Sequence, residues 1–343
     1  VVRRDDDADR TLAEGHAPHP RRTRRFVTAL TTVCVGVLVL AGCGPEPVRQ
    51  PSTGPSSETA TIPAITPCIH WPSRCGYPDA TTTGVADRTR LRRVPEDVTS
   101  GPGWAWDPRG WVRVTQDGAV VEDLEVSGPI DVTGSHVIVR NNVIHVAGET
   151  WGVALRHTTG ATVSGNEIGA ADTTPRLLVG IKDIYGDAVG TTVTRNDIAG
   201  ASTGTQIASG VVRDNYIHDL AMVDGDHVNG ITSNGGTERL VIEHNTVLNH
   251  FDQTDAIGLF QDFGVEADRL IKDNLLAGGG YTIYGGDNRR FGVTHDIQIV
   301  GNRISRVFFP SGGHFGPLAS FDHQGVGNLW ADNVWDEDGS PIP

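Results

Sequence analysis

The chain of 343 residues contains 28 Lys and Arg residues against 42 Asp and Glu residues, which gives a formal net charge of −14 at pH 7. A quarter of the positive charge lies in the first 25 residues, so the remainder is more acidic still. Nucleic-acid binding needs a clustered basic face for the phosphates, and this composition excludes such a partner. The only two lysines are Lys182 and Lys272, so a basic group in a functional groove must be one of them, an arginine or a histidine.

The beginning of the chain has the pattern of an export signal. An arginine-rich segment, 21–25, precedes a mostly apolar run over 26–40, which is shorter than the about 20 residues that a membrane-spanning helix needs. The run ends in Leu40-Ala41-Gly42-Cys43, which resembles the lipobox of bacterial lipoproteins, and this resemblance implies a lipid on Cys43. We therefore expect residues 1–43 to be an N-terminal extension and signal peptide, and the chain to be exported and anchored to the outer face of the cell membrane. Ordinary secretion is the alternative, and the export route stays open.

Residues 44–66 are rich in Pro, Ser, Thr and Gly and have no hydrophobic period, so we predict a disordered tether. Residues 67–118 follow as a cap region. They contain Cys68 and Cys75, the only cysteine pair after the signal segment. In an exported protein this pair predicts a disulfide rather than a metal site. Three tryptophans before residue 119 are expected to cover the open end of the following domain.

A repeated unit, apolar-x-x-Asn-x-apolar, organises the rest of the chain. Its asparagines are separated by 19 to 31 residues, the spacing of a solenoid, and are Asn142, Asn166, Asn196, Asn215, Asn245, Asn274, Asn302 and Asn333. The units are rich in Val, Ile and Thr, which favours strands. We expect each asparagine to occupy a sharp bend with left-handed backbone angles and to hydrogen-bond the asparagines of neighbouring coils. A β-sandwich with asparagine turns is the alternative that this regular phase disfavours.

The predicted fold is therefore all-β: a single-stranded right-handed parallel β-helix of about 8–9 coils over residues 119–343, with a C-terminal cap. A second set of strands lies between the asparagine units, for example Val153-Ala154-Leu155, Val179-Gly180-Ile181 and Asp255-Ala256-Ile257. We align these strands on their last apolar residue. That alignment predicts that Arg156 and Lys182 stack in one outward column.

Segments 76–85 and 121–128, together with the asparagine-marked coils, resemble the pectin-lyase-like superfamily of right-handed β-helix proteins, and more narrowly its exported actinobacterial members. The resemblance covers about residues 76–335. It implies the fold but leaves the activity open, because the same coil carries lyases, hydrolases, epimerases and adhesins.

Two adjacent coils have polar residues at the start of the second strand, in segments 226–231 and 252–257. The second segment is similar to the Asn-Thr-Asp-Gly-Ile-Asp segment of polygalacturonases, which places Asp255 at the position of that family's first catalytic Asp. It departs from the family at Gln253, Ala256 and Gly258, the last of which replaces the family's second Asp. Because glycoside hydrolysis needs two carboxyl groups, only Asp262 remains as a nearby replacement.

A polysaccharide lyase instead needs a base and a positive group or Ca²⁺ beside the uronate carboxyl. We therefore expect a surface enzyme that cleaves acidic polysaccharide by β-elimination in a groove along the helix. The expected catalytic residues are Lys182, His227 and Asp255. The expected substrate-binding residues are Arg156, Asn229, Gln253, Gln261, Tyr281 and Tyr284. An optional Ca²⁺ would be held by Asp226, Asp252 and Asp262 through oxygen ligands.

Three alternatives stay open for the function. They are a polygalacturonase-like glycoside hydrolase, a monomeric surface protein that binds glycan or cell-wall polymer without cleaving it, and a structural stalk. Expected partners in every case but the last are a polysaccharide and, through Cys43, the membrane.

Overall fold

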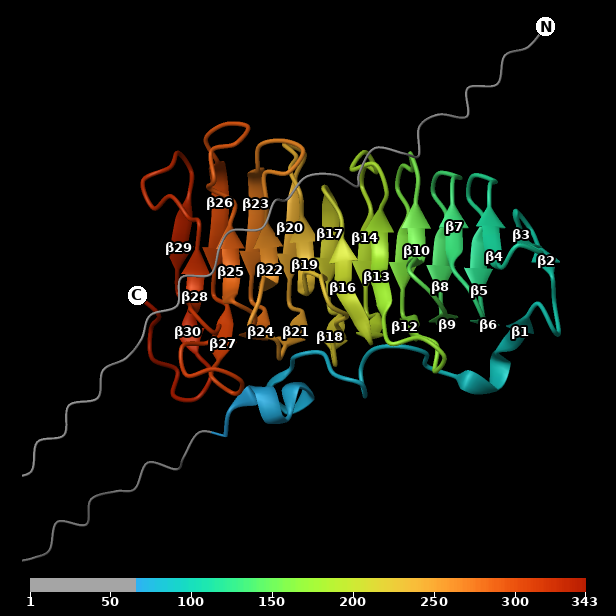
Figure 1. The fold of residues 1–343 in the computed structure, drawn as a ribbon, viewed down its shortest axis with the longest axis horizontal. Helices are drawn as coiled ribbons and strands as arrows, with labels where there is room; N and C mark the ends of the chain where they lie inside the picture. The colour runs from blue at the N-terminus through green and yellow to red at the C-terminus, as the bar shows by residue number, and fades with distance from the viewer. Residues whose placement is uncertain (1–65) are drawn as a thin grey trace, which may run out of the picture. The chain divides into compact units, whose positions relative to one another are not determined.

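The computed structural model describes residues 66–343, and the expectations for residues 1–65, including the signal segment, Cys43 and nearly all of the tether, lie outside the described residues. The chain winds into a parallel β-helix of about 9 turns, with one strand of each of three sheets in each full turn (Figure 1). This confirms the predicted all-β solenoid. The only helices in the described part are short 3-10 turns: η1 (Cys68–His70), η2 (Pro72–Cys75) and η3 (Arg88–Arg90). None of the described helices is long and apolar enough to cross a membrane.

Sheet A has ten strands: β1 (Arg92–Val94), β6 (Leu124–Val126), β9 (Val143–Val146), β12 (Glu167–Ala170), β15 (Asp197–Ala199), β18 (Tyr216–His218), β21 (Thr246–Asn249), β24 (Leu275–Gly278), β27 (Arg303–Ser305) and β30 (Val334–Trp335). Sheet B has eleven: β2 (Ser100–Gly101), β3 (Trp104–Asp107), β4 (Trp111–Val114), β7 (Ile130–Val132), β10 (Trp151–Leu155), β13 (Leu177–Asp183), β16 (Ala201–Gln206), β19 (Asn229–Ser233), β22 (Asp255–Leu259), β25 (Tyr281–Gly285) and β28 (Gly316–Ala319). Sheet C has nine: β5 (Val120–Glu122), β8 (Ile138–Arg140), β11 (Thr162–Ser164), β14 (Thr192–Thr194), β17 (Gly210–Arg213), β20 (Leu240–Glu243), β23 (Ala267–Lys272), β26 (His295–Val300) and β29 (Leu329–Ala331).

The interior consists of columns of branched aliphatic side chains, one residue from each coil. In sheet C, for instance, Val163, Val193 and Val212 are consecutive partners in register, and all three are fully buried. Because equivalent residues repeat at each turn, the same Val or Ile packs on itself along the helix axis. The repeat in the sequence is therefore the direct cause of the continuous core.

The eight asparagines form a buried ladder at the corner between sheets C and A. Asn166 is typical: its Nδ2 donates to Asn196 Oδ1 of the next coil at 2.9 Å and to the Val139 carbonyl of the previous coil at 3.0 Å. The expected amide ladder is thus confirmed. The expected left-handed backbone is wrong for the asparagines themselves, because the positive φ belongs to the residue before each one, such as Asn141, Arg195 or His244.

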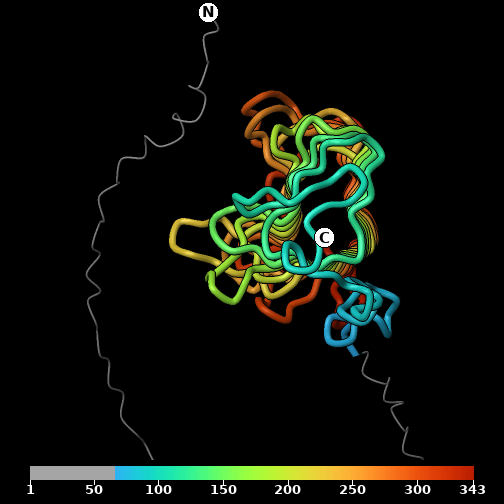
Figure 2. The backbone as a smooth tube through the Cα atoms, turned by 90° about the vertical axis from the view of Figure 1, so that its right-hand side faces the viewer, coloured from blue at the N-terminus to red at the C-terminus, as the bar shows by residue number. Residues whose placement is uncertain are grey.

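Residues 66–91 form a strap that runs along the outside of sheet A, from the last coils back to the first (Figure 1), and lies outside the coil cross-section in the view along the helix (Figure 2). Its beginning contains the predicted Cys68–Cys75 disulfide, with a Cα–Cα distance of 5.7 Å. The backbone N–H groups of Cys68 and Ile69 donate to the carboxylate of Asp336. Further along, the Gly84 N–H donates to the Arg195 carbonyl.

The strap ends where β1 pairs with β6 as the first strand of sheet A. The antiparallel strands β2, β3 and β4 then cover the N-terminal end, and β4 pairs in parallel with β7. Trp104 is buried in this cap. The sheets of the β-helix therefore already begin within residues 92–114, ahead of residue 119, where the sequence predicted the β-helix to start.

Candidate active site

In the strands of sheet B, two consecutive residues face the interior, which interrupts the usual alternation of inward and outward side chains. In β13 both Gly180 and Ile181 face the interior: a Cβ at Gly180 would lie 2.7 Å from the core residue Ile198, and Ile181 is fully buried. Lys182 then points outward. The same step recurs in β19, where Gly230 and Ile231 are the inward pair. Residues just before and just after each inward pair therefore form two parallel outward columns.

The strand register corrects the column predicted for Arg156 and Lys182. Lys182 is paired with Ala154 on one side and Gln206 on the other, whereas Arg156 follows the end of β10. The two basic residues are thus offset by two positions. Alignment on the last apolar residue was wrong here because Leu155 aligns with Asp183, and Ile181 aligns with Val153.

A cavity of about 370 Å³, called here the central cavity, opens on this face over β16, β19 and β22. It brings together three residues predicted from the sequence, His227, Asn229 and Asp262. Its other lining residues are Thr203, Gln206, Thr232, Asn234, Thr254 and Phe260. Sequence reasoning missed these six. The signal that could have found Gln206 and Thr232 is their place in the same outward column as Lys182.

Asp255 lies at the edge of this cavity and is fully buried. It is the register partner of Asn229. Its carboxylate occupies the space over Gly258, where a Cβ would lie 2.4 Å from Asp255 Oδ2 and 2.5 Å from the ring of Phe260. The absence of a side chain at Gly258 therefore makes room for the carboxyl group, and Phe260 covers it.

Neither carboxylate oxygen of Asp255 has a hydrogen-bond partner in the described structure, and neither has Asn229 Oδ1. Burial without a compensating charge raises the pKa of Asp255 well above its ordinary value. Such an environment favours the neutral form of the carboxyl group, in which it can act as a hydrogen-bond donor. Asn229 Nδ2 lies 3.3 Å from Thr203 Oγ1 and from the His227 carbonyl, so its amide is held at the cavity wall.

Lys182 faces the same side as Asp255 but does not reach it. Strands β13 and β22 are three steps apart in sheet B, which corresponds to about 14 Å at the usual spacing of neighbouring strands. The predicted catalytic set of Lys182, His227 and Asp255 therefore divides into a pair at the central cavity and a lysine farther along the groove.

The three predicted calcium ligands are not brought together. Arg176 donates two hydrogen bonds to Asp226, and Ser202 donates a third. These contacts hold the pKa of Asp226 well below its ordinary value and use the oxygens a metal would need. Asp262 forms an ion pair with Arg290 at 3.4 Å, and Asp252 is exposed. In residues 66–343 no group of three or more His, Cys, Asp or Glu side chains has the arrangement of a metal site.

Of the remaining predicted binding residues, the two glutamines hydrogen-bond the backbone and the two tyrosines contact other aromatic rings. Gln261 is buried, and its amide bonds the backbone of Gly286, Gly292 and Phe291, so it supports a loop. Gln253 Nε2 donates to the Asp226 carbonyl at 2.9 Å. Tyr281 and Tyr284 contact each other edge to face, and Tyr284 also contacts Phe260. The two tyrosines thus extend the covered side of the central cavity towards the C-terminal coils.

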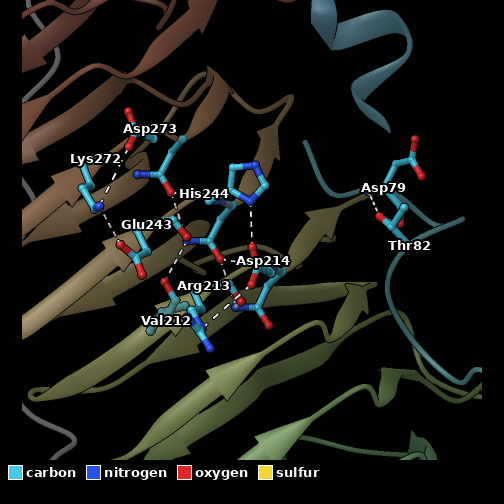
Figure 3. A network of polar contacts seen from close by, with 12 residues as sticks. Asp79, Thr82, Val212, Arg213, Asp214, Glu243, His244, Lys272 and Asp273 are labelled. Atoms are coloured by element: carbon cyan, nitrogen blue, oxygen red, sulfur yellow. Dashed lines mark hydrogen bonds and ion pairs between the residues drawn. The ribbon is translucent and has the colours of Figure 1, made fainter. Parts of the chain in front are cut away.

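A separate polar network lies on the corner between sheets C and A (Figure 3) and contains none of the residues that line the central cavity. There His244 hydrogen-bonds Asp214 at 2.7 Å, and Lys272 forms an ion pair with Glu243 at 3.0 Å. Tyr77 of the strap stacks on His244. Each of these charges has a partner of opposite sign, and the network connects neighbouring coils.

Comparison of the chain with protein-family models, with curated proteins and with solved structures gives no match. The functional conclusion therefore depends on the geometry of the outward face of sheet B.

Proposed function

We propose that the outward face of sheet B binds a linear acidic polysaccharide and that the central cavity cleaves it by β-elimination. The observation that carries this proposal is the cavity that joins His227 to Asn229, beside the fully buried carboxyl group of Asp255. A groove across parallel strands suits a linear polymer, because both repeat at regular intervals.

The proposed chemistry assigns one task to each residue. The imidazole of His227, exposed at the cavity, removes the proton next to the uronate carboxyl group. The electrons of that C–H bond form the new carbon–carbon double bond, and the glycosidic oxygen leaves and takes a proton from water. The Asn229 amide, whose N–H groups contact Thr203 Oγ1 and the His227 carbonyl at 3.3 Å, would redirect one of them to the uronate carboxylate, where negative charge develops. His227 is assigned as the base, and Lys182 is not, because Lys182 lies too far along the groove.

Asp255 is assigned a positioning role, because its side chain is fully buried and is not among the residues that line the central cavity. Its proton would be donated to Asn229 Oδ1, the register neighbour whose oxygen has no other partner. That contact would fix the amide with its NH₂ group towards the cavity.

The test is incubation of the purified protein with pectate, alginate and glycosaminoglycans, with and without Ca²⁺, and measurement of unsaturated product by ultraviolet absorbance. His227→Ala should lower kcat by roughly 100-fold or more, while His295→Ala, an exposed histidine of sheet C, should leave it unchanged. Asp255→Asn keeps a donor towards Asn229 and should retain activity, whereas Asp255→Leu should lose it. Absence of unsaturated product from every substrate would exclude β-elimination on these polymers.

Hydrolysis is the second candidate, favoured by Asp262 on the same cavity. Protonated Asp255 would then serve as the acid and ionised Asp262 as the base or nucleophile, once Phe260 moves aside. In this case reducing ends appear without unsaturation, and Asp255→Asn is inactive. A protein that only binds glycan would show neither product.

We further propose that the chain is an exported lipoprotein of the pectin-lyase-like type. The lipobox-like segment ending at Cys43 and the parallel β-helix support this, and the Cys68–Cys75 disulfide fits an oxidising compartment. Labelling of expressing bacterial cells with a palmitate analogue should mark the protein, and Cys43→Ser should abolish the label. Unchanged labelling of that variant would refute lipidation at this cysteine.

A further inference from the structure

A second cavity, called here the N-terminal cavity, lies on the same face of sheet B nearer the N-terminal cap. It has a volume of about 250 Å³, which is room for one sugar ring. Its walls include the indole rings of Trp111 and Trp151 and the ion pair between Arg156 and Asp131. A cavity lined by two indole rings and a charged pair suits a ligand with apolar faces and polar groups at its edge.

Lys182 borders this cavity on the side of the central cavity. Its Nζ lies 5.9 Å from the centre of the Trp151 ring, and the guanidinium carbon of Arg156 lies 5.5 Å from the same ring. The indole face thus attracts two cations at once. Such a concentration of positive charge is unusual in a chain with a net charge of −14.

The two cations differ in how they are compensated. Arg156 has Asp131 at 2.6 Å. Lys182, by contrast, has no carboxylate within 4.0 Å in residues 66–343. Its neighbour Asp183 turns away and accepts N–H groups of Gly186 and Ala188. Burial lowers the pKa of Lys182, and the charge of Asp183 only partly opposes this.

A partly desolvated ammonium group without a counter-charge gains most from an anionic ligand. A carboxylate or sulfate between Lys182 and Arg156 would complete the charge balance, while the ring that bears it stacks on Trp151. The two cations thereby recognise the anionic group of the ligand, and the indole recognises its sugar ring.

We propose that Lys182, Trp151 and Arg156 form a recognition subsite for an anionic sugar of the polysaccharide, with Lys182 serving in binding and not in bond cleavage. This rests on the proposed function for the location of the scissile bond. Strands β13 and β19 are two steps apart, about 10 Å at normal strand spacing, which is close to the length of a disaccharide. The subsite therefore selects chains that carry a negative charge about two sugars away from the bond at His227.

Binding can be measured by calorimetry at low ionic strength with hexasaccharides of galacturonate, mannuronate and chondroitin sulfate. Each is paired with its neutral form, prepared by carboxyl reduction and, for chondroitin, desulfation. We expect at least one acidic hexasaccharide to bind more tightly than its neutral form. Lys182→Met should lower the affinity for that acidic hexasaccharide by roughly tenfold and leave the affinity for its neutral form unchanged. Trp151→Ala should weaken both, and Trp151→Phe should restore part of the loss.

Lys272→Met is the matched control, because it removes the same charge on the opposite corner of the coil, where Lys272 is paired with Glu243. Equal weakening by Lys182→Met and Lys272→Met, no preference for acidic over neutral chains, or no binding of any hexasaccharide would overturn the subsite. Because binding is read without turnover, failure of cleavage alone leaves the subsite standing. If the parent protein cleaves its substrate and Lys182→Met binds the acidic hexasaccharide as tightly as the parent does, the subsite is refuted and the proposed function stands.

Discussion

Asp255 and Asn229 are partners in register on the adjacent strands β22 and β19, and each has a buried side-chain oxygen without a hydrogen-bond partner within residues 66–343. A buried carboxyl group of this kind is tolerated only when it is neutral. The pair therefore links the protonation of one residue to the orientation of the other.

The first prediction concerns the pH dependence of stability. The pKa of Asp255 is raised in the folded state, so folding binds a proton at pH values between the ordinary carboxyl pKa of about 3.9 and the raised one. Stability is therefore lost as the pH rises through that window. Asp255→Asn removes this loss and should be more stable than the parent protein at neutral pH, with the difference vanishing in acid. Urea unfolding at several pH values measures it, with the exposed Asp262→Asn as control. A difference that does not depend on pH would contradict the assignment.

The second prediction concerns the asparagine ladder. Asn245→Ala removes the acceptor of the Asn215 N–H and the donors to the Val212 carbonyl and Asn274. Because these groups are buried, the free energy of unfolding should fall by roughly 3 kcal/mol. Asn288→Ala, in an exposed loop, should change it by less than about 0.5 kcal/mol. Chemical denaturation compares the two, and equal small effects would show that the ladder contributes little.

The third prediction concerns His218. Burial alone would lower the pKa of this histidine, but hydrogen bonds with Asp197 and Asp219 outweigh it and raise the pKa. The stabilisation by this group is fully present below the unfolded pKa of about 6.5 and is lost as the pH rises through the folded value. The difference in unfolding free energy between the parent and His218→Asn should therefore be largest in mild acid. An NMR titration of the ring that gives an ordinary or lowered pKa would contradict this.

The fourth prediction concerns the start of the strap. Asp336 is fully buried and accepts the N–H groups of Cys68 and Ile69 as well as a hydrogen bond from Arg303. Asp336→Ala should release the beginning of the strap and lower the unfolding free energy by about 2 kcal/mol or more. Hydrogen exchange should then increase in residues 66–80 first. Asp332→Ala, which removes an exposed carboxylate four residues earlier, serves as comparison. Exchange that rises equally in both variants would argue against the contact between Asp336 and the strap.

The sequence predicted the scaffold because each coil repeats the same physical requirement. Asn245, for example, must bond both neighbours, and its short amide side chain carries the donor and the acceptor that this requires. The bend was assigned to the wrong residue, since the ladder asparagine and the left-handed residue are neighbours, His244 and Asn245.

The site was predicted only in part, for reasons that are local. His227, Asn229 and Asp255 were found from polar residues at the start of a strand. The position of Lys182 was not, because apolar Leu155 is the register partner of Asp183, so that alignment on the last apolar residue shifts the comparison by two positions. Phe260 covers Asp255 from beyond the strand end, and no periodic pattern points to such a contact.

The strap changes how the coils depend on one another. In a simple solenoid each coil contacts only its neighbours, so the ends can fray independently. Here residues 66–91 contact the last coils at Asp336, a middle coil at Arg195 and an early coil at Asn141, and they lead directly into β1. Opening either end must also detach this external segment from coils far along the axis. The molecule is thereby expected to unfold as one unit, with a cooperativity closer to that of a globular domain than to that of a repeat array.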